Sequence, residues 1–281
     1  MFVTPRGGLS SIVVAITSSL PAGTVRLNTS IERITRETNR WRVTASLPLP
    51  LGEGRGEGQC ERPLPAAPHP NPLPEGEGTA NSQRATELEF DGLIVAAPAP
   101  IASRLLADVD GELATELSAI EYAGAVVVSM AFDRRQIRQP LDGFGFVVPA
   151  IERRRILSAS FPSVKFPGRA PVGKALIRTF VGGACQRELV DLSDAVLERI
   201  VTEELRDLLG ITGQPLWAMI ARWSQSMPQY HLGHLDRVAR IEAQASALPG
   251  LALAGNAYRG VGIPHAIRSG EEAAERTLGH A

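Results

Sequence analysis

The sequence has few cysteines, no long apolar run and almost no net charge, and each of these absences excludes a class of protein. The two cysteines, Cys60 and Cys185, match neither a metal-ligand spacing nor a disulfide framework, which predicts a reducing compartment. No stretch of 18 apolar residues occurs, so we expect no membrane-spanning helix. The formal net charge of −1 lacks the basic excess that a nucleic-acid partner requires. We therefore expect a cytoplasmic globular protein that does not bind nucleic acid.

Side chains that bind metals or perform acid–base catalysis are equally sparse. The five histidines are scattered, and only His231 and His234 lie close enough in sequence to ligate together. They fall in a Pro/Gly-containing segment without an obvious third ligand, whereas zinc needs three or four. No Ser/His/Asp set and no convincing acid/base pair is present. We therefore expect no metal site, and we assign no catalytic residue.

The 281 residues do contain an ordinary share of core-forming side chains, 44% apolar and 21% charged, which suits one large domain or two. The periodicity of the apolar residues predicts a mixed α/β fold. Helices are expected over residues 10–19, 101–106, 111–120, 193–209 and 235–247. Strands are expected in short runs within 25–43, over 88–95, and over 126–132, 144–148, 156–160, 174–181 and 216–223. The section from residue 121 to 221 should form a mostly antiparallel layer.

Residues 46–83 interrupt this pattern with eight prolines and six glycines. The motif Pro-Leu-Pro-x-Gly-Glu-Gly occurs twice there, at 48–54 and 72–78. Such a composition buries too little apolar surface to offset the entropy of ordering the chain. We expect a disordered insertion in a hairpin whose strands end near Ala45 and begin near Thr86. A polyproline ligand for an SH3- or WW-like partner is the alternative.

The C-terminal stretch from residue 251 predicts a short buried strand, a glycine-rich turn over 255–262, and a helix that runs towards Leu278. Pro264 suits the first turn of this helix, where its missing N–H costs nothing. The free N–H groups at such a helix start attract a phosphate or an electron-rich ring edge. An ordinary α/β crossover has the same pattern. Small or apolar residues should face a sheet: Ala266, Ile267, Gly270, Ala273 and Ala274.

Four stretches in chain order resemble one known family: 143–149, 178–183, 222–234, and 255–264 with 269–274 behind it. The family is that of oxygen-dependent protoporphyrinogen or coproporphyrinogen oxidases, haem-pathway members of the FAD-dependent amine-oxidase-like superfamily. The resemblance covers nearly everything except residues 46–83. It implies a partial FAD-binding Rossmann-like domain with an inserted, mostly antiparallel substrate domain. Residues 1–120 and 222–281 would belong to the FAD-binding domain, and 121–221 to the substrate-binding domain.

The resemblance also implies the residues that contact ligands. Trp223 matches a residue packed on the cofactor, and Ile31 matches an apolar residue whose backbone holds the adenine, although a plain sheet residue fits Ile31 equally well. The implied substrate wall, for which a plain core position is the alternative, consists of Phe144, Val147 and Phe180. Arg178 is left out of the site, because an arginine on a strand is more often solvated. The implied FAD contacts are Ile31, Trp223, Gly255, Asn256, Val261, Gly262 and Ile263.

The implied reaction is removal of hydride and protons from a porphyrinogen, with FAD as cofactor and dioxygen as acceptor. The family begins with a Gly-x-Gly-x-x-Gly turn that holds the pyrophosphate, and this sequence has no such fingerprint. Three hypotheses follow: a truncated porphyrinogen oxidase that binds little FAD alone, a half-protein that docks onto a separately encoded N-terminal half, or another branch such as an amine oxidase or carotenoid desaturase. Homodimerisation and peripheral membrane contact stay open.

Overall fold

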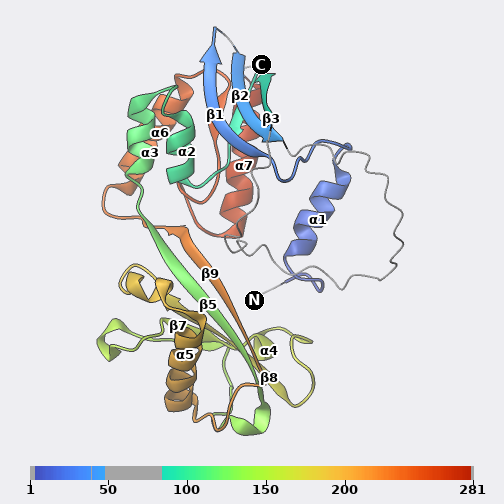
Figure 1. Ribbon diagram of the computed structural model, residues 1–281, viewed down its shortest axis with the longest axis vertical. Coiled ribbons are helices and arrows are strands. Elements are labelled where there is room, and N and C mark those ends of the chain that lie inside the picture. The colour runs from blue at the N-terminus through green and yellow to red at the C-terminus, as the bar shows by residue number, and fades with distance from the viewer. Residues whose placement is uncertain (1–3, 39, 48–83, 280–281) are drawn as a thin grey trace. The chain divides into compact units, whose positions relative to one another are not determined.

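A computed structural model describes residues 4–38, 40–47 and 84–279. These residues form two compact units (Figure 1). Unit 1 comprises the described residues of 1–22, 119–234 and 259–262, and unit 2 those of 23–118, 235–258 and 263–281. Apart from its first two residues, the insertion expected at 46–83 lies outside the described part of the chain.

Unit 1 is built on a five-stranded sheet in which every neighbouring pair is antiparallel. Its strand order is β6 (Gly145–Val147), β7 (Ser158–Ser160), β8 (Lys174–Gly182), β5 (Tyr122–Asp133) and β9 (Trp217–Pro228). The antiparallel layer expected from the sequence is therefore confirmed. β9 continues to Pro228, beyond the expected end near residue 223, because it also pairs with the beginning of β5, where Tyr122 lies opposite Pro228.

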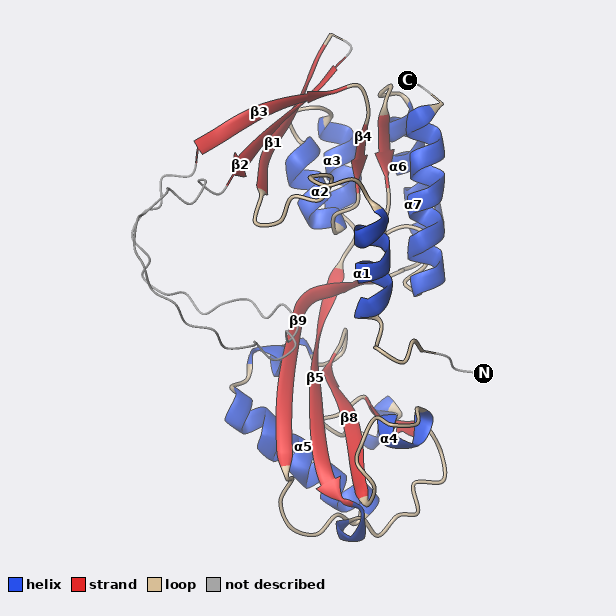
Figure 2. Ribbon diagram, turned by 90° about the vertical axis from the view of Figure 1, so that its right-hand side faces the viewer, coloured by secondary structure: helices blue, strands red, loops and turns tan. Residues whose placement is uncertain are grey.

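One face of this sheet is covered by α5 (Asp194–Leu209) (Figure 2). Leu197, Val201 and Leu205 recur at helical spacing, so they lie on one side of α5 and join the same buried cluster as β5 and β8. The helix ends where Gly210 adopts a left-handed conformation with φ of 63°. This confirms the helix expected at 193–209.

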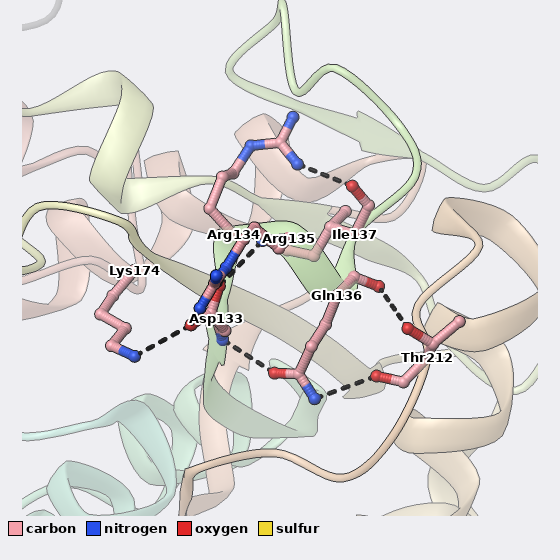
Figure 3. A network of polar contacts seen from close by, with 7 residues as sticks. All are labelled: Asp133, Arg134, Arg135, Gln136, Ile137, Lys174 and Thr212. Atoms are coloured by element: carbon pink, nitrogen blue, oxygen red, sulfur yellow. Dashed lines mark hydrogen bonds and ion pairs between the residues drawn. The ribbon is translucent and has the colours of Figure 1, made fainter.

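A polar network fastens the end of β5 to its neighbours (Figure 3). The Asp133 carboxylate accepts from the Arg135 N–H at 3.0 Å and from Lys174 Nζ at 3.2 Å. The Gln136 side chain accepts from the Asp133 N–H at 2.8 Å and donates to the Thr212 carbonyl at 3.0 Å. These bonds cap the 3-10 turn η1 (Arg134–Gln136) and join β8 and the loop after α5 to the end of β5.

Four further elements of unit 1 are short. They are α1 (Ser10–Ser19), η2 (Ala150–Glu152), α4 (Pro162–Lys165) and η3 (Arg187–Asp191). α1 forms where the sequence predicts it, but none of its residues is buried.

Unit 2 contains an antiparallel three-stranded sheet, a parallel pair of strands and four helices. The sheet has the order β1 (Ser30–Glu37), β2 (Arg40–Leu47), β3 (Arg84–Phe90), and the pair is β4 (Leu93–Val95) with β10 (Leu251–Leu253). The helices are α2 (Ala99–Leu106), α3 (Gly111–Ser118), α6 (His234–Ser246) and α7 (Ile263–Leu278). The hairpin expectation is confirmed, because Ala45 pairs with Thr86.

Two expectations about strands in unit 2 are wrong. The single strand expected over 88–95 is divided into β3 and β4 at Asp91 and Gly92. At Gly92 a Cβ would lie 2.4 Å from the Thr277 side chain, so the backbone there passes too close to α7 for any larger residue. Val25 and Leu27 lie before β1, outside any strand, and are exposed.

Candidate functional site

The C-terminal strand, turn and helix form as the sequence predicts. All three residues of β10 are buried, and they pair in parallel with β4. The glycine-rich turn follows, and α7 then begins at Ile263 with Pro264 as its second residue. Gly255 and Gly260 have φ values of 123° and 150°, which residues other than glycine rarely adopt.

Gly255 combines a firmly held backbone with open space. Its N–H donates to Ser269 Oγ of α7 at 3.0 Å. A Cβ at this position would meet no heavy atom within 4 Å. The backbone is therefore accessible to a flat ligand on the side where any other residue would carry its side chain. This cradle leaves space for the flavin contact that the resemblance implies, and that contact stays a prediction.

The small face of α7 allows the helix to lie close to the parallel pair. Ala273 is completely buried and clusters with Ala252 and Ala254 of the β10 segment. Ala266, Gly270 and Ala274 of the same expected face are half-buried. Ile267 differs from the expectation, because it is exposed.

The second candidate surface is the face of the five-stranded sheet opposite α5. The register places one residue from each strand side by side in a row: Val147, Ser158, Phe180, Val127 and Ala221. Trp223 lies two residues beyond Ala221 on the same face of β9 and pairs with Ala125. Val147 is 79% exposed and Trp223 46% exposed, so this face presents apolar side chains to its surroundings.

The open face thus brings together Val147, Phe180 and Trp223, which are separated in turn by 33 and 43 positions in the sequence. Phe144 is not part of the row. It precedes β6, its carbonyl accepts from the Phe161 N–H at 2.9 Å, and its side chain is 55% exposed. Its role as a substrate contact stays a prediction.

Arg178 also lies on the open face, two residues from Phe180 along β8, and it pairs with Ser129 and Ser160. Within residues 4–38, 40–47 and 84–279 its side chain has no hydrogen bond or ion pair. Sequence reasoning omitted this residue because an arginine on a strand is more often solvated, and the sequence does not show which residues share its face. The register and the position of α5 supply that information.

The remaining expected FAD contacts divide between the turn and β1. Val261 and Ile263 are exposed at the end of the turn and the start of α7, while Asn256 and Gly262 are half-buried. Ile31 lies on β1, pairs with Ala45 and is 40% exposed. These positions leave each residue accessible to a ligand, and the binding roles stay predictions.

Sequence reasoning missed Tyr230. Its phenol oxygen accepts a hydrogen bond from the Gly260 N–H at 3.0 Å. Burial raises the pKa of Tyr230, and the Gly260 N–H only partly offsets this effect. The available signal was the tyrosine of the 222–234 motif, which the resemblance marked without assigning it a role.

Two properties of the described chain concern ions and membranes. In residues 4–38, 40–47 and 84–279 no three His, Cys, Asp or Glu side chains gather where they could hold a metal ion. Within the same ranges, no helix combines the length and the apolar character needed to cross a bilayer.

Comparison with known proteins relates the chain to flavoenzymes. The family described as flavin containing amine oxidoreductase matches residues 2–278. Coproporphyrinogen III oxidase of Bacillus subtilis (strain 168) is 35% identical over 192 residues, which cover 68% of this chain and 40% of that protein. The mitochondrial protoporphyrinogen oxidase of Nicotiana tabacum is 33% identical over 205 residues, covering 71% of this chain and 41% of that one.

Among solved structures, a crystal structure from Exiguobacterium sp. 255-15 with a provisional protoporphyrinogen oxidase assignment has a TM-score of 0.75 to this chain. The two are 27% identical, over 97% of this chain and 51% of that chain. The chain therefore spans about half the length of the solved protein and 40–41% of the two curated relatives. The resemblance and the mixed α/β fold expected from the sequence are confirmed, and the chain belongs to the family of flavin-containing amine oxidoreductases.

Proposed function

We propose that this chain provides the flavin-ring and substrate contacts of an enzyme that oxidises a porphyrinogen to the porphyrin with dioxygen as acceptor. The observation that carries the proposal is the glycine turn before α7, with its open backbone at Gly255. The comparisons support the proposal, because the relatives reported above are named as coproporphyrinogen III and protoporphyrinogen oxidases. FAD is the proposed cofactor, and a bound flavin would accept hydride from the substrate and pass the electrons to dioxygen.

The residues of the turn would hold the cofactor through their backbone. Gly255 offers an unobstructed face, and the hydrogen bond from its N–H to Ser269 Oγ already holds its backbone. The start of α7 points free N–H groups towards the turn, and these favour electron-rich atoms. The contacts proposed from the resemblance are Gly255, Asn256, Val261, Gly262, Ile263, Ile31 and Trp223.

The open face of the five-stranded sheet would form the apolar wall for the porphyrinogen. A porphyrinogen is wide and flat, and carries carboxylates at its edge, so its pocket needs apolar walls and a cation at the margin. Val147 and Phe180 supply apolar surface in one row across the strands. Arg178, two residues from Phe180, supplies a guanidinium that no described carboxylate neutralises. A substrate carboxylate is a suitable partner for it.

A second candidate is favoured by the exposed apolar surface of α1 and by the size of the parallel sheet. α1 has six large apolar residues at or next to it that are exposed: Leu9, Ile12, Val13, Val14, Ile16 and Leu20. In the described chain the pair of β4 and β10 has no third strand, whereas parallel sheets are normally larger and covered on both faces. In this alternative the chain acts together with a second polypeptide that carries a dinucleotide-binding βαβ segment.

Titration with FAD tests the proposal. We expect flavin fluorescence to be quenched when the chain is added, alone or together with the segment of the Bacillus subtilis relative that lies outside the aligned region. Gly255→Ala should weaken binding at least about tenfold, because a side chain would enter the cradle and strain a backbone with positive φ. The matched control is Gly23→Ala, which has a positive φ of 84° and equally open space but lies outside the turn.

The control should bind FAD as the unchanged chain does. Absence of FAD binding under both conditions, or equal loss in the two variants, would contradict the proposal. Porphyrin binding, followed by fluorescence with coproporphyrin III and protoporphyrin IX, would distinguish a substrate with four carboxylates from one with two.

A further inference from the structure

We propose that Tyr230 is a positioning residue, which sets the conformation of the glycine turn before α7 through the hydrogen bond between its phenol oxygen and the Gly260 N–H. This inference rests on the proposed function, because it assigns a role in flavin binding to a residue that does not itself belong to the turn. The contacts that carry it all lie within unit 1.

The hydrogen bond holds the backbone N–H of Gly260 in one direction. Gly260 has a φ of 150°, which residues other than glycine rarely adopt. Because glycine has no side chain, its backbone has little intrinsic preference for one conformation over another. The Tyr230 oxygen accepts from its N–H at 3.0 Å. Gly260 is three residues before the first residue of α7, so its orientation determines how Val261 and Gly262 enter the helix start.

Tyr230 can act as an anchor because its own ring is fixed. The ring stacks on the His234 imidazole, with centroids 4.0 Å apart and planes 12° from parallel. The His234 N–H donates to the His231 carbonyl at 3.0 Å, which closes the segment into a tight turn between the two aromatic rings.

The same segment is tied to the start of β5. The Gln229 N–H donates to the Glu121 carbonyl at 2.8 Å, and the Glu121 carboxylate lies 3.8 Å from His231 Nε2. Arg187 donates to that carboxylate at 2.9 Å. Tyr230 thus connects the flexible backbone of Gly260 to a segment of unit 1 that hydrogen bonds hold to the start of β5.

The phenol is suited to this task in its neutral form. A tyrosine phenol is uncharged near neutral pH, and burial raises the pKa of Tyr230 further in the same direction. A neutral oxygen accepts from Gly260 without placing an anion next to a ligand that is rich in electrons. A phenylalanine would keep the stacked ring and lose only the acceptor.

Amide hydrogen exchange tests the inference on the full chain. In Tyr230→Phe we expect the Gly260 amide to exchange at least about fivefold faster, as the loss of one neutral hydrogen bond predicts. Amides at the centre of β5, such as those of Val128 and Met130, should keep their rates. Tyr122→Phe removes the same atom from a residue of β5 and should leave the Gly260 rate unchanged.

FAD affinity, measured by titration as above, is the second readout and should fall about fivefold in Tyr230→Phe only, because the turn must then be ordered by the ligand. Unchanged exchange at Gly260, or equal changes in both variants, overturns the inference. Faster exchange at Gly260, together with no FAD binding by the unchanged chain either alone or with the complementary segment, would support the hydrogen-bonding role of Tyr230 and refute the proposed function. Faster exchange with unaltered FAD affinity would refute the role of the anchor in flavin binding.

Discussion

Glu204 shows at the residue scale how unit 1 accommodates a buried charge. It lies on α5 and is 6% exposed, yet its carboxylate accepts from Arg154 Nη1 at 2.9 Å and from the Arg155 N–H at 3.0 Å. Burial opposes ionisation most strongly, but the Arg155 N–H and the Arg154 guanidinium together outweigh it and hold the pKa of Glu204 below its ordinary value. The pair fastens the connection between β6 and β7 to α5.

We expect Glu204→Gln to lower the free energy of unfolding by about 1–3 kcal/mol at pH 7, because charge-assisted hydrogen bonds are lost at a buried site. Since the pKa is lowered by folding, the contribution is complete above the unfolded pKa of about 4.3 and is lost as pH falls through the lower folded value. Urea denaturation at neutral and at acid pH measures this, and the difference should disappear in acid.

The neighbouring Glu203 provides the control for this measurement. It pairs with Arg155 Nη2 at 2.7 Å, but both side chains are nearly half exposed, so the pair is screened by solvent. Glu203→Gln should change the free energy of unfolding by less than about 0.5 kcal/mol. Equal effects of the two substitutions would mean that burial of Glu204 does not strengthen its contacts.

At the scale of elements, β8 separates a covered face from an open one by strict alternation. Ile177 and Val181 point into the cluster with α5, while Phe180 lies in the row across the open face. This alternation is what a sheet with one solvent-facing side requires. The proposed substrate wall therefore depends on α5 covering only the opposite face.

Alanine substitution on the two faces of β8 tests this assignment. Ile177→Ala should cost about 2–5 kcal/mol of unfolding free energy, because it leaves a cavity in a fully buried cluster. Phe180→Ala should cost clearly less, since its side chain is only partly buried, but it should weaken porphyrin binding. Urea denaturation measures the unfolding free energy of each variant, and porphyrin fluorescence measures its affinity for porphyrin. A larger loss of stability in Phe180→Ala would refute the assignment of faces.

The whole molecule carries more exposed apolar surface on α1 than a helix in water normally tolerates. The hydroxyl groups of Ser11, Thr17, Ser18 and Ser19 all donate to backbone carbonyls in or just before the helix, so they add little polarity to its surface. A helix that is apolar on all sides is usually buried. Contact with a second polypeptide would supply that burial.

We expect Val13→Glu to weaken association with the complementary segment of the Bacillus subtilis relative by at least about tenfold, because a charge would have to be desolvated at the contact. Analytical ultracentrifugation of mixtures measures the dissociation constant. The matched control is Val172→Glu, which places the same charge on a fully exposed loop residue of unit 1. If the control weakens association equally, or if the unchanged chain does not associate at all, α1 is not the contact surface.

Much of unit 1 and of the C-terminal segment could be predicted because the relevant signals are local. The apolar spacing from Leu197 to Leu209 and the closing Gly210 define α5, and Pro264 after a glycine-rich turn defines the start of α7. The division into β3 and β4 could not be predicted, because the two strands pair in different sheets and the close approach of Thr277 to Gly92 involves a residue distant in sequence.

The sequence by itself determined the turn at Gly255 to Gly262 and the start of α7 at Pro264, because glycine permits positive φ and proline restricts φ to a helical value through their own covalent structure. Only the tertiary structure decided that Val147, Phe180 and Trp223 share an open face, and that Tyr230 holds Gly260. These contacts depend on the register between strands and on the segment that each loop meets. The register depends on which face of each strand is buried, and that is decided only when distant segments such as α5 pack on the sheet.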